Sequence, residues 1–300
     1  MTAPLEIGFT APQDRQQVAE LEALGADSLW VGGHIASTNP SPEALIWLAR
    51  LAEQTERVAI GTATLLLPLY PPAIVAKQIA DLDRAAAGRL RLGIGVGGEY
   101  LSDFGASEVP IDERGSRMDE AIDLLRQFWT AEPVTHHGRH HTFEKIRIHP
   151  APHHPSGPPI IVSGRKPVAM RRAARVGNGW MPYLYSPERY ARSVATIRDE
   201  AEHHRRDLTD FGWYAYVFVS MDDDPAAATA AAQNFFGNTY RDNFADFLDR
   251  VACVGTPEQV TERLRAFVQA GARHLIVVPC SRQQETYQRV LTEIRPQLEQ

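Results

Sequence analysis

The chain has 300 residues, of which 44% are hydrophobic and 23% charged, and its formal net charge is −6. This is enough apolar sequence for a substantial core. The net negative charge, with Lys and Arg spread along the chain, argues against nucleic acid or an anionic membrane as a partner. No stretch has the length and apolarity of a membrane span, and the first residues show no basic segment followed by an apolar run, so we expect no secretion signal. Cys253 and Cys280 indicate two free thiols in a reducing cytoplasm, with a disulfide as the minor alternative.

Short apolar strands alternate with segments that have helical spacing of apolar residues. Proline after a Ser or Thr cap predicts helix starts at Ser41, Ser186 and Thr256, and Ser116 with Asp119 is interpreted as a variant capping box. Eight strands separated by helices favour a (β/α)8 TIM barrel, which usually takes about 250 residues, over a doubly wound sheet. The expected strands are 5–10, 28–31, 58–67, 89–96, 159–163, 179–181, 213–221 and 274–278.

The region from about 132 to 158 interrupts this alternation. Two short β-prone runs flank Gly138, and a proline-rich stretch follows, which suggests a β-hairpin insertion between the fourth and fifth strands. We therefore expect one domain covering residues 1–300, with the insertion as an excursion from it.

The fourth strand leads into the most informative stretch. The strand ends in Gly97-Gly98-Glu99, and in parallel α/β proteins ligands bind at the C-terminal ends of strands. Gly93, Gly95 and Gly98 match G-x-G-x-x-G, but the polar, broken segment 99–110 follows instead of a helix, so a dinucleotide fingerprint is rejected. Glycines there are interpreted as giving a flat ligand close access, and Glu99 as a candidate acid/base or hydrogen-bond acceptor, against the alternative of a solvated loop carboxylate.

Three other strands carry candidate site residues, either within the strand or just after it. His34 follows the second strand and could move a proton, although a plain loop histidine is the alternative. Thr62-Ala63-Thr64 interrupts the third strand with small residues, which indicates either a bulge or tight packing. Ser163-Gly164-Arg165 precedes a helix, and its hydroxyl, backbone N–H groups and guanidinium would suit a phosphate; the alternative is a simple turn.

Clustered histidines invite a metal interpretation that the spacing does not favour. They lie around the expected hairpin turn without acids or cysteines at ligand spacing, and His153-His154 lies in the proline-rich loop. We therefore predict no metal site. The histidines of the hairpin are His136, His137, His140 and His141.

Several longer motifs together resemble the bacterial luciferase-like monooxygenase superfamily of flavin- and deazaflavin-dependent oxidoreductases. They are LGADSLWVGGH, GTATLLLPLYPPAIVAKQIADLDRAAAGRLRLGIGVGG, ERGSRMDEAIDLLRQFW, PIIVSG and RRAARVGNGW, which together extend over nearly the whole chain. The resemblance implies a β/α barrel, usually dimeric, with its cofactor at the C-terminal ends of the strands.

The resemblance also implies roles for individual residues. Thr62-Ala63-Thr64 would back the flavin ring, and Gly97-Gly98-Glu99 would lie beside its reacting face. Ser163-Gly164-Arg165, with Trp180 and Tyr183, would contact the phosphate and ribityl groups. His34 matches a histidine that follows an acidic residue in many members, but Gly33 occupies the acidic position here, which puts an Asp–His pair in doubt.

The sequence is most similar to the deazaflavin branch, whose cofactor is coenzyme F420. We therefore predict F420-dependent hydride transfer to or from a small organic substrate, with His34 and Glu99 as proton-handling residues in a cytoplasmic homodimer. One alternative is an FMN-dependent monooxygenase that receives reduced FMN from a partner reductase and uses O2, and a second is a non-catalytic flavin-binding protein. In each enzyme case the cofactor brings the reactivity and the protein positions it.

Substrate choice is expected to depend on the loop 100–113, the hairpin and the region 235–247. Phe235, Phe236, Tyr240, Phe244 and Phe247 could line an apolar pocket, but their spacing equally suits a helix packed on the barrel, which we favour.

Overall fold

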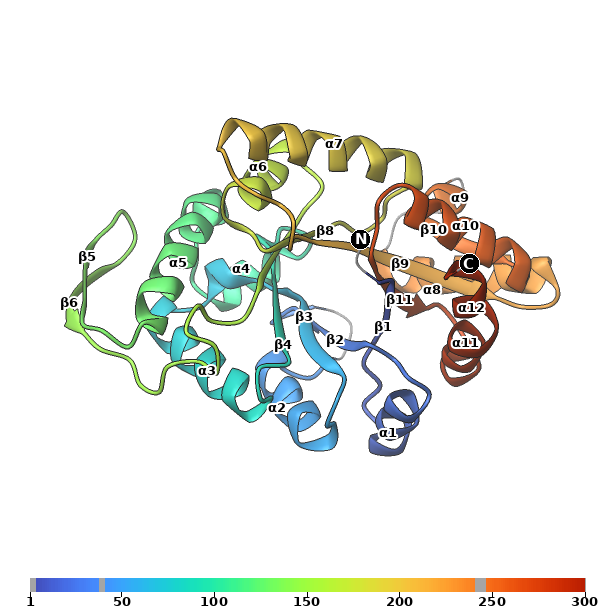
Figure 1. Ribbon diagram of the computed structural model, residues 1–300, viewed down its shortest axis with the longest axis horizontal. Helices are drawn as coiled ribbons and strands as arrows, with labels where there is room; N and C mark the ends of the chain where they lie inside the picture. The colour runs from blue at the N-terminus through green and yellow to red at the C-terminus, as the bar shows by residue number, and fades with distance from the viewer. Residues whose placement is uncertain (1–3, 38–40, 241–246, 300) are drawn as a thin grey trace. The chain divides into compact units, whose positions relative to one another are not determined.

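The computed structural model describes residues 4–37, 41–240 and 247–299 (Figure 1). Its strands are β1 Glu6–Thr10, β2 Ser28–Gly33, β3 Ala59–Leu65, β4 Leu90–Ile94, β5 Val134–His137, β6 Thr142–Ile146, β7 Ile160–Ser163, β8 Gly179–Met181, β9 Gly212–Met221, β10 Ala252–Gly255 and β11 His274–Pro279. The helices are α1 Arg15–Ala23, α2 Ala44–Gln54, α3 Pro72–Ala85, α4 Leu101–Ala106, α5 Arg114–Trp129, α6 Pro167–Val176, α7 Pro187–His203, α8 Pro225–Tyr240, α9 Leu248–Val251, α10 Pro257–Gln269, α11 Gln283–Arg289 and α12 Arg295–Leu298. The 3-10 helices are η1 Leu67–Leu69 and η2 Ile111–Glu113, and η4 Val290–Ile294 is a π-helix.

The main sheet has the strand order β10-β9-β11-β1-β2-β3-β4-β7-β8, and β8 also pairs with β9. The pairing closes eight parallel strands into a (β/α)8 barrel, which confirms the predicted fold and excludes the doubly wound alternative. All eight predicted strands are present. The short strand β10 was not predicted; it pairs in parallel with β9, with Cys253 opposite Val219, on the side of β9 away from β11.

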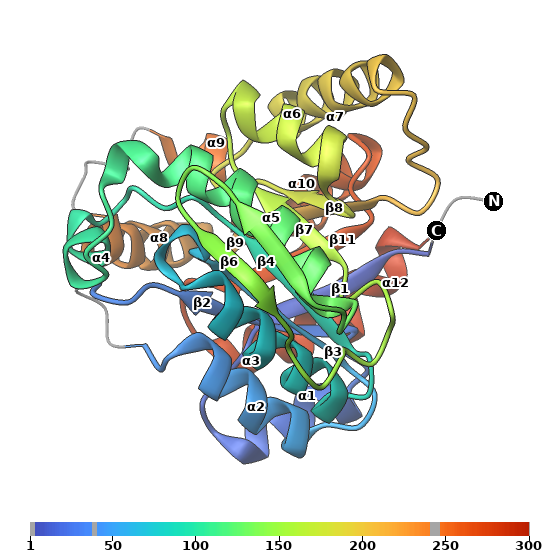
Figure 2. The ribbon, with the colours of Figure 1, turned by 90° about the vertical axis from the view of Figure 1, so that its left-hand side faces the viewer.

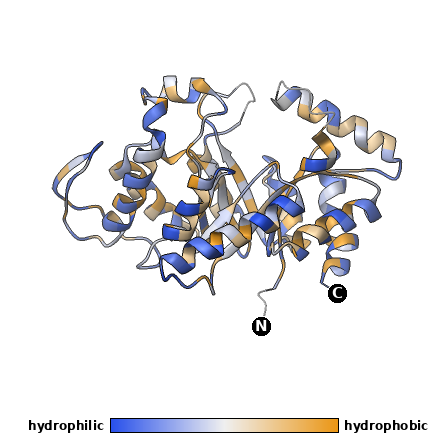
Figure 3. Ribbon diagram, turned by 90° about the horizontal axis from the view of Figure 1, so that it is seen from above, coloured by the Kyte–Doolittle hydropathy of each residue, from blue (hydrophilic) through white to orange (hydrophobic). Residues whose placement is uncertain are grey.

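The chain forms two compact units, one made of residues 31–163 and the other of residues 1–30 and 164–300. In the first unit α2 packs on α3 and α3 on α5. Figure 3 shows hydrophobic and hydrophilic residues interleaved along the helices, as expected where one face of a helix packs and the other meets water. Within the described ranges, no helix has the length and hydropathy needed to cross a membrane.

The predicted hairpin exists as the antiparallel pair β5–β6, seen beside α5 in Figure 2. Its turn is fastened to α5 through Glu120, whose carboxylate accepts hydrogen bonds from His136 Nε2 at 3.0 Å, His140 N at 3.0 Å and His141 N at 2.9 Å. Those histidines therefore have a structural contact. Among the residues that the structure describes, no group of three His, Cys, Asp or Glu side chains is arranged to hold a metal ion.

Two predicted helix caps are wrong. Helix α2 is capped by Glu43, whose carboxylate accepts from Ile46 N at 2.8 Å, two residues beyond the predicted Ser41. Helix α5 begins at Arg114 and has no side-chain cap, while Ser116 Oγ donates to Glu113 O at 3.0 Å. Helix α2 therefore begins later than the local signal indicates and α5 begins earlier, because helix ends depend on packing as well as on the cap.

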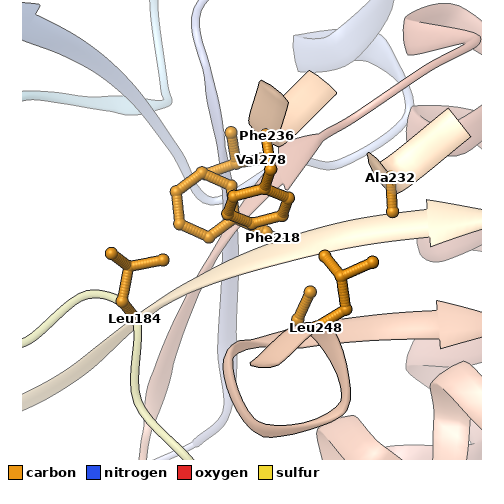
Figure 4. Packing of buried hydrophobic residues seen from close by; sticks show 7 residues of the cluster. Leu184, Phe218, Ala232, Phe236, Leu248 and Val278 are labelled. Carbon is orange, nitrogen blue, oxygen red and sulfur yellow. The ribbon is translucent and has the colours of Figure 1, made fainter. Parts of the chain in front are cut away.

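The second unit contains an apolar cluster between α8, α9 and strands β9 and β11 (Figure 4). Phe236 is fully buried there against Phe218, with ring centroids 5.0 Å apart, so this part of 235–247 packs in the core as favoured. Phe235 packs on the same cluster, Phe247 is 48% exposed, and Phe244 lies outside the described residues. The predicted caps at Ser186 and Thr256 are confirmed, the latter as a complete capping box.

Candidate active site

A histidine between two carboxylates forms the centre of the candidate site in the unit 31–163. His34 directly follows β2, and its Nδ1 lies 2.7 Å from Asp103 Oδ2. Its Nε2 lies 3.7 Å from Glu99 Oε2. The side chains of His34 and Glu99 are 29% and 35% exposed, whereas that of Asp103 is fully buried. The two predicted proton-handling residues are therefore close together, and both side chains are partly exposed.

Opposing effects act on the pKa of His34. Burial lowers it, but the neighbouring carboxylates of Glu99 and Asp103 favour the imidazolium, and the net pKa is raised above its usual value. A histidine tuned in this way can hold or release a proton near neutral pH, as general acid–base catalysis requires.

Asp103 is the residue that the sequence analysis missed. Segment 99–110 was interpreted as a broken loop, but it contains the short helix α4, with Asp103 in its first turn. Asp103 Oδ1 accepts from Ile35 N at 2.8 Å and Ala36 N at 2.7 Å, so the carboxylate also ties down the loop after β2. The sequence offered one signal: Asp103 is a second acid shortly after Glu99, and it stands next to the apolar Phe104. The structure shows that Phe104 is buried.

The structure explains why the acidic residue expected before His34 is glycine. A Cβ at Gly33 would lie 2.5 Å from Thr64 O and 3.0 Å from Leu65 Cα, so no side chain fits there without moving the backbone of β3. Glycine at position 33 left an Asp–His pair in doubt. The structure shows such a pair, in which Asp103 supplies the carboxylate.

The third strand contains the predicted bulge. The register of β3 on β4 shifts between Gly61 and Leu65, and the peptide between Ala63 and Thr64 is cis. Thr62 is fully buried and its Oγ1 donates to Gly93 O at 2.6 Å, while Ala63 and Thr64 remain partly accessible. This gives a narrow surface of small side chains, which suits the face of a flat ring.

Glycines beside the bulge leave this surface without further side chains. A Cβ at Gly95 would lie 2.5 Å from Thr64 Oγ1. Gly97 and Gly98 have φ of +70° and +122°, which other residues rarely adopt. A Cβ at Gly98 would meet nothing closer than Arg114 Nε at 3.9 Å, so the chain before Glu99 is bare backbone. The residues present therefore fit a planar cofactor ring.

The predicted phosphate-contacting residues lie at the end of β7 and in the unit 1–30 and 164–300. Ser163 ends β7 and is partly exposed. Gly164 has φ of +146°, and a Cβ there would lie 2.6 Å from Ala169 Cβ, so glycine lets the loop approach α6. Helix α6 has no side-chain cap at its start. Pro167 has no N–H, and the N–H groups of Ala169 and Met170 both donate to Lys166 O, so a phosphate here would depend on the Ser163 hydroxyl and the Arg165 guanidinium.

Aromatic rings hold the cations of this loop. The Arg165 guanidinium lies over the Tyr183 ring at 4.5 Å, and its Nη2 donates to Tyr183 Oη at 3.3 Å. Arg189 Nη2 and Tyr185 Oη both donate to Arg165 O at 3.3 Å. Trp180 is fully buried and its Nε1 donates to Gly164 O at 3.0 Å, so it supports the loop from behind.

A barrel with an imidazole–carboxylate pair and a glycine-rich surface near its strand ends fits a cofactor-dependent oxidoreductase. The sequence profile described as luciferase-like monooxygenase matches residues 4–274, and the chain belongs to that family. It is an oxidoreductase of the luciferase-like class.

Curated relatives carry narrower names. The chain is 30% identical over 311 residues to a protein of Intrasporangium calvum named F420-dependent glucose-6-phosphate dehydrogenase, covering 91% of this chain and 92% of that one. It is 29% identical to a protein of the same name from Kribbella flavida, covering 96% of each.

Solved structures share the fold. An F420-dependent secondary alcohol dehydrogenase in complex with an F420-acetone adduct has a TM-score of 0.86 and 22% identity, with 99% of both chains covered. The oxygenating constituent of 3,6-diketocamphane monooxygenase from Pseudomonas putida, in complex with FMN, has a TM-score of 0.77 and 19% identity, with 98% of this chain and 99% of that one covered.

Proposed function

We propose that the protein is an F420-dependent oxidoreductase that interconverts a small organic alcohol and its carbonyl compound. The names of the curated relatives support the cofactor. The observation that carries the reaction class is the placement of His34, with Nδ1 on buried Asp103 and Nε2 beside the partly exposed Glu99.

F420, when bound, supplies the hydride acceptor or donor. The protein's own residues then accept or donate the proton of the substrate hydroxyl group. With its Nδ1–H on Asp103, neutral His34 presents the lone pair of Nε2, which accepts the hydroxyl proton as an alcohol is oxidised and returns it when a carbonyl is reduced. Glu99 is the second proton-handling group, 3.7 Å from the same nitrogen.

The proposal assigns the cofactor to the residues predicted from the sequence. Thr62, Ala63, Thr64, Gly97 and Gly98 would hold the ring. The phosphate would be held by Ser163, Gly164 and Arg165, with Tyr183 stacked on the arginine and Trp180 supporting the loop. We further propose that the chain acts as one domain in a cytoplasmic homodimer, in keeping with its two free cysteines.

The test is anaerobic turnover with F420 and a panel containing glucose 6-phosphate and short secondary alcohols. We expect loss of F420 absorbance with at least one alcohol, and a fall of about 10²–10⁴-fold in kcat for His34→Gln. Turnover that needs reduced FMN, a reductase and O2 would instead support the monooxygenase alternative. Tight cofactor binding with no substrate-dependent turnover, either with F420 or with reduced FMN and O2, would support a flavin-binding protein.

A further inference from the structure

We propose that Asp103 is the positioning residue of His34, fixing the proton on Nδ1 so that Nε2 is the nitrogen that exchanges protons with substrate. This inference rests on the proposed function for its catalytic meaning, but the tautomer itself is a property of the protein alone. The sequence around His34 does not indicate its contact with Asp103, because the two residues are 69 positions apart in the chain.

Hydrogen-bond chemistry gives the direction of the proton. An ionised carboxylate only accepts, so the Nδ1 atom 2.7 Å from Asp103 Oδ2 must be the donor. A neutral imidazole carries one N–H, so its Nε2 is then unprotonated. That nitrogen points toward the partly exposed Glu99, while Asp103 has no exposed surface.

Asp103 is itself held rigidly. Besides His34 it binds the N–H groups of Ile35 and Ala36, and the adjacent Ser102 Oγ donates to Ala36 O at 2.7 Å. The Tyr100 ring packs edge-on against His34 with centroids 4.8 Å apart. Segment 100–103 therefore holds the imidazole from two sides. The His34 ring is already oriented before substrate binds, so binding need not order it.

Among the residues that the structure describes, the titratable groups near this pair include two carboxylates and one phenol. Glu99 and Asp103 flank His34, and Tyr70 lies near Asp103, where burial and then the Glu43 and Asp103 charges raise the pKa of its phenol. The phenol therefore stays neutral and does not compete for the proton near neutral pH. The tautomer of His34 is set by its contact with Asp103.

Asp103→Asn separates positioning from loop support. The amide oxygen can still accept from Ile35 N and Ala36 N, but the NH2 group then faces His34 Nδ1 and can only donate. The imidazole must therefore move its proton to Nε2. Ser102→Ala is the matched control, because it removes a neighbouring tether of the same loop and leaves the His34 contact intact.

The measurement is ¹⁵N NMR of histidine-labelled full-length protein without cofactor, with His34 assigned by His34→Gln. We expect Nδ1–H in the wild type and Ser102→Ala, and Nε2–H with a lower His34 pKa in Asp103→Asn. With F420 bound, kcat of Asp103→Asn should fall about 10²-fold or more, while KM and cofactor affinity change less than about threefold.

An unchanged tautomer in Asp103→Asn, or the same switch in Ser102→Ala, would overturn the inference. Failure of the proposed function has a different signature. If the tautomer switches as expected but the wild type neither binds F420 nor turns over any alcohol, Asp103 still positions His34 and the assigned reaction is wrong.

Discussion

Gly33 and Thr64 touch backbone to backbone: a Cβ on the glycine would lie 2.5 Å from the threonine carbonyl oxygen. This contact brings the end of β2 against the bulge of β3, so the same glycine sets the position of His34 and of the surface proposed to back the cofactor ring.

Adding one methyl group there should disturb both. Gly33→Ala is expected to lower the unfolding free energy by about 1–3 kcal/mol through overpacking and to weaken cofactor binding. Gly32→Ala is the matched control, because a Cβ at Gly32 meets nothing within 4 Å. Thermal denaturation of both variants tests this, and equal Tm values for the two would contradict the contact.

The raised pKa of His34 predicts how rate depends on pH. Alcohol oxidation needs neutral His34, so its kcat should rise with pH through a midpoint above the usual value of 6.5, and carbonyl reduction should fall through the same midpoint. Glu99→Gln removes one carboxylate that favours the imidazolium, so the midpoint should move down. A pH profile of kcat that keeps its midpoint in Glu99→Gln would show that Glu99 does not act on His34.

The same shift contributes to stability with a defined sign. Since the folded pKa is raised, the contribution of His34 is complete below the pKa of the unfolded chain and is lost as pH rises through the folded pKa. The difference in unfolding free energy between wild type and His34→Gln should therefore shrink from pH 5.5 to about 9. Denaturant titrations at the two pH values measure it, and a growing difference would reverse the sign.

Arg165 should strengthen the binding of a deazaflavin that carries a phosphate over one that lacks it. Arg165→Ala is expected to weaken F420 binding about 10–100-fold through loss of a charged hydrogen bond, and to leave binding of a deazaflavin without the phosphate nearly unchanged. Arg198→Ala is the control, because Arg198 lies on α7 and its guanidinium lies 5.5 Å over the Trp213 ring of β9. Equal weakening for both ligands would mean that Arg165 supports the loop rather than the phosphate.

Glu120 should hold the hairpin in a pH-dependent way. Burial alone would raise its pKa, but bonds from His136, His140 and His141 lower it overall, so its stabilising effect is lost as pH falls through the folded pKa. Glu120→Ala should speed amide exchange of β5 and β6 at pH 7 and leave F420 binding intact. Hydrogen exchange that is slow and unchanged in the variant would contradict this attachment.

The sequence predicted what local patterns encode. Alternating apolar runs specify the strands, and Thr256-Pro257 with Gln259 specifies a helix start. His34 and Glu99 were both found, because His34 directly follows β2 and Glu99 lies in the loop after β4. Asp103 was not, since its role depends on contacts 67 to 69 residues away. Strand β10 was missed for a similar reason: its four residues form a strand by pairing with residues 218–221 of β9, beyond the residues 212 and 213 at which β8 pairs with it.

Cofactor choice is the central claim, and titration of the purified protein separately with F420 and FMN tests it most directly. Fluorescence quenching by micromolar F420, with no saturable response to FMN, is the predicted result. Saturable binding of FMN alone would contradict the account and move the protein to the oxygen-using branch of its family.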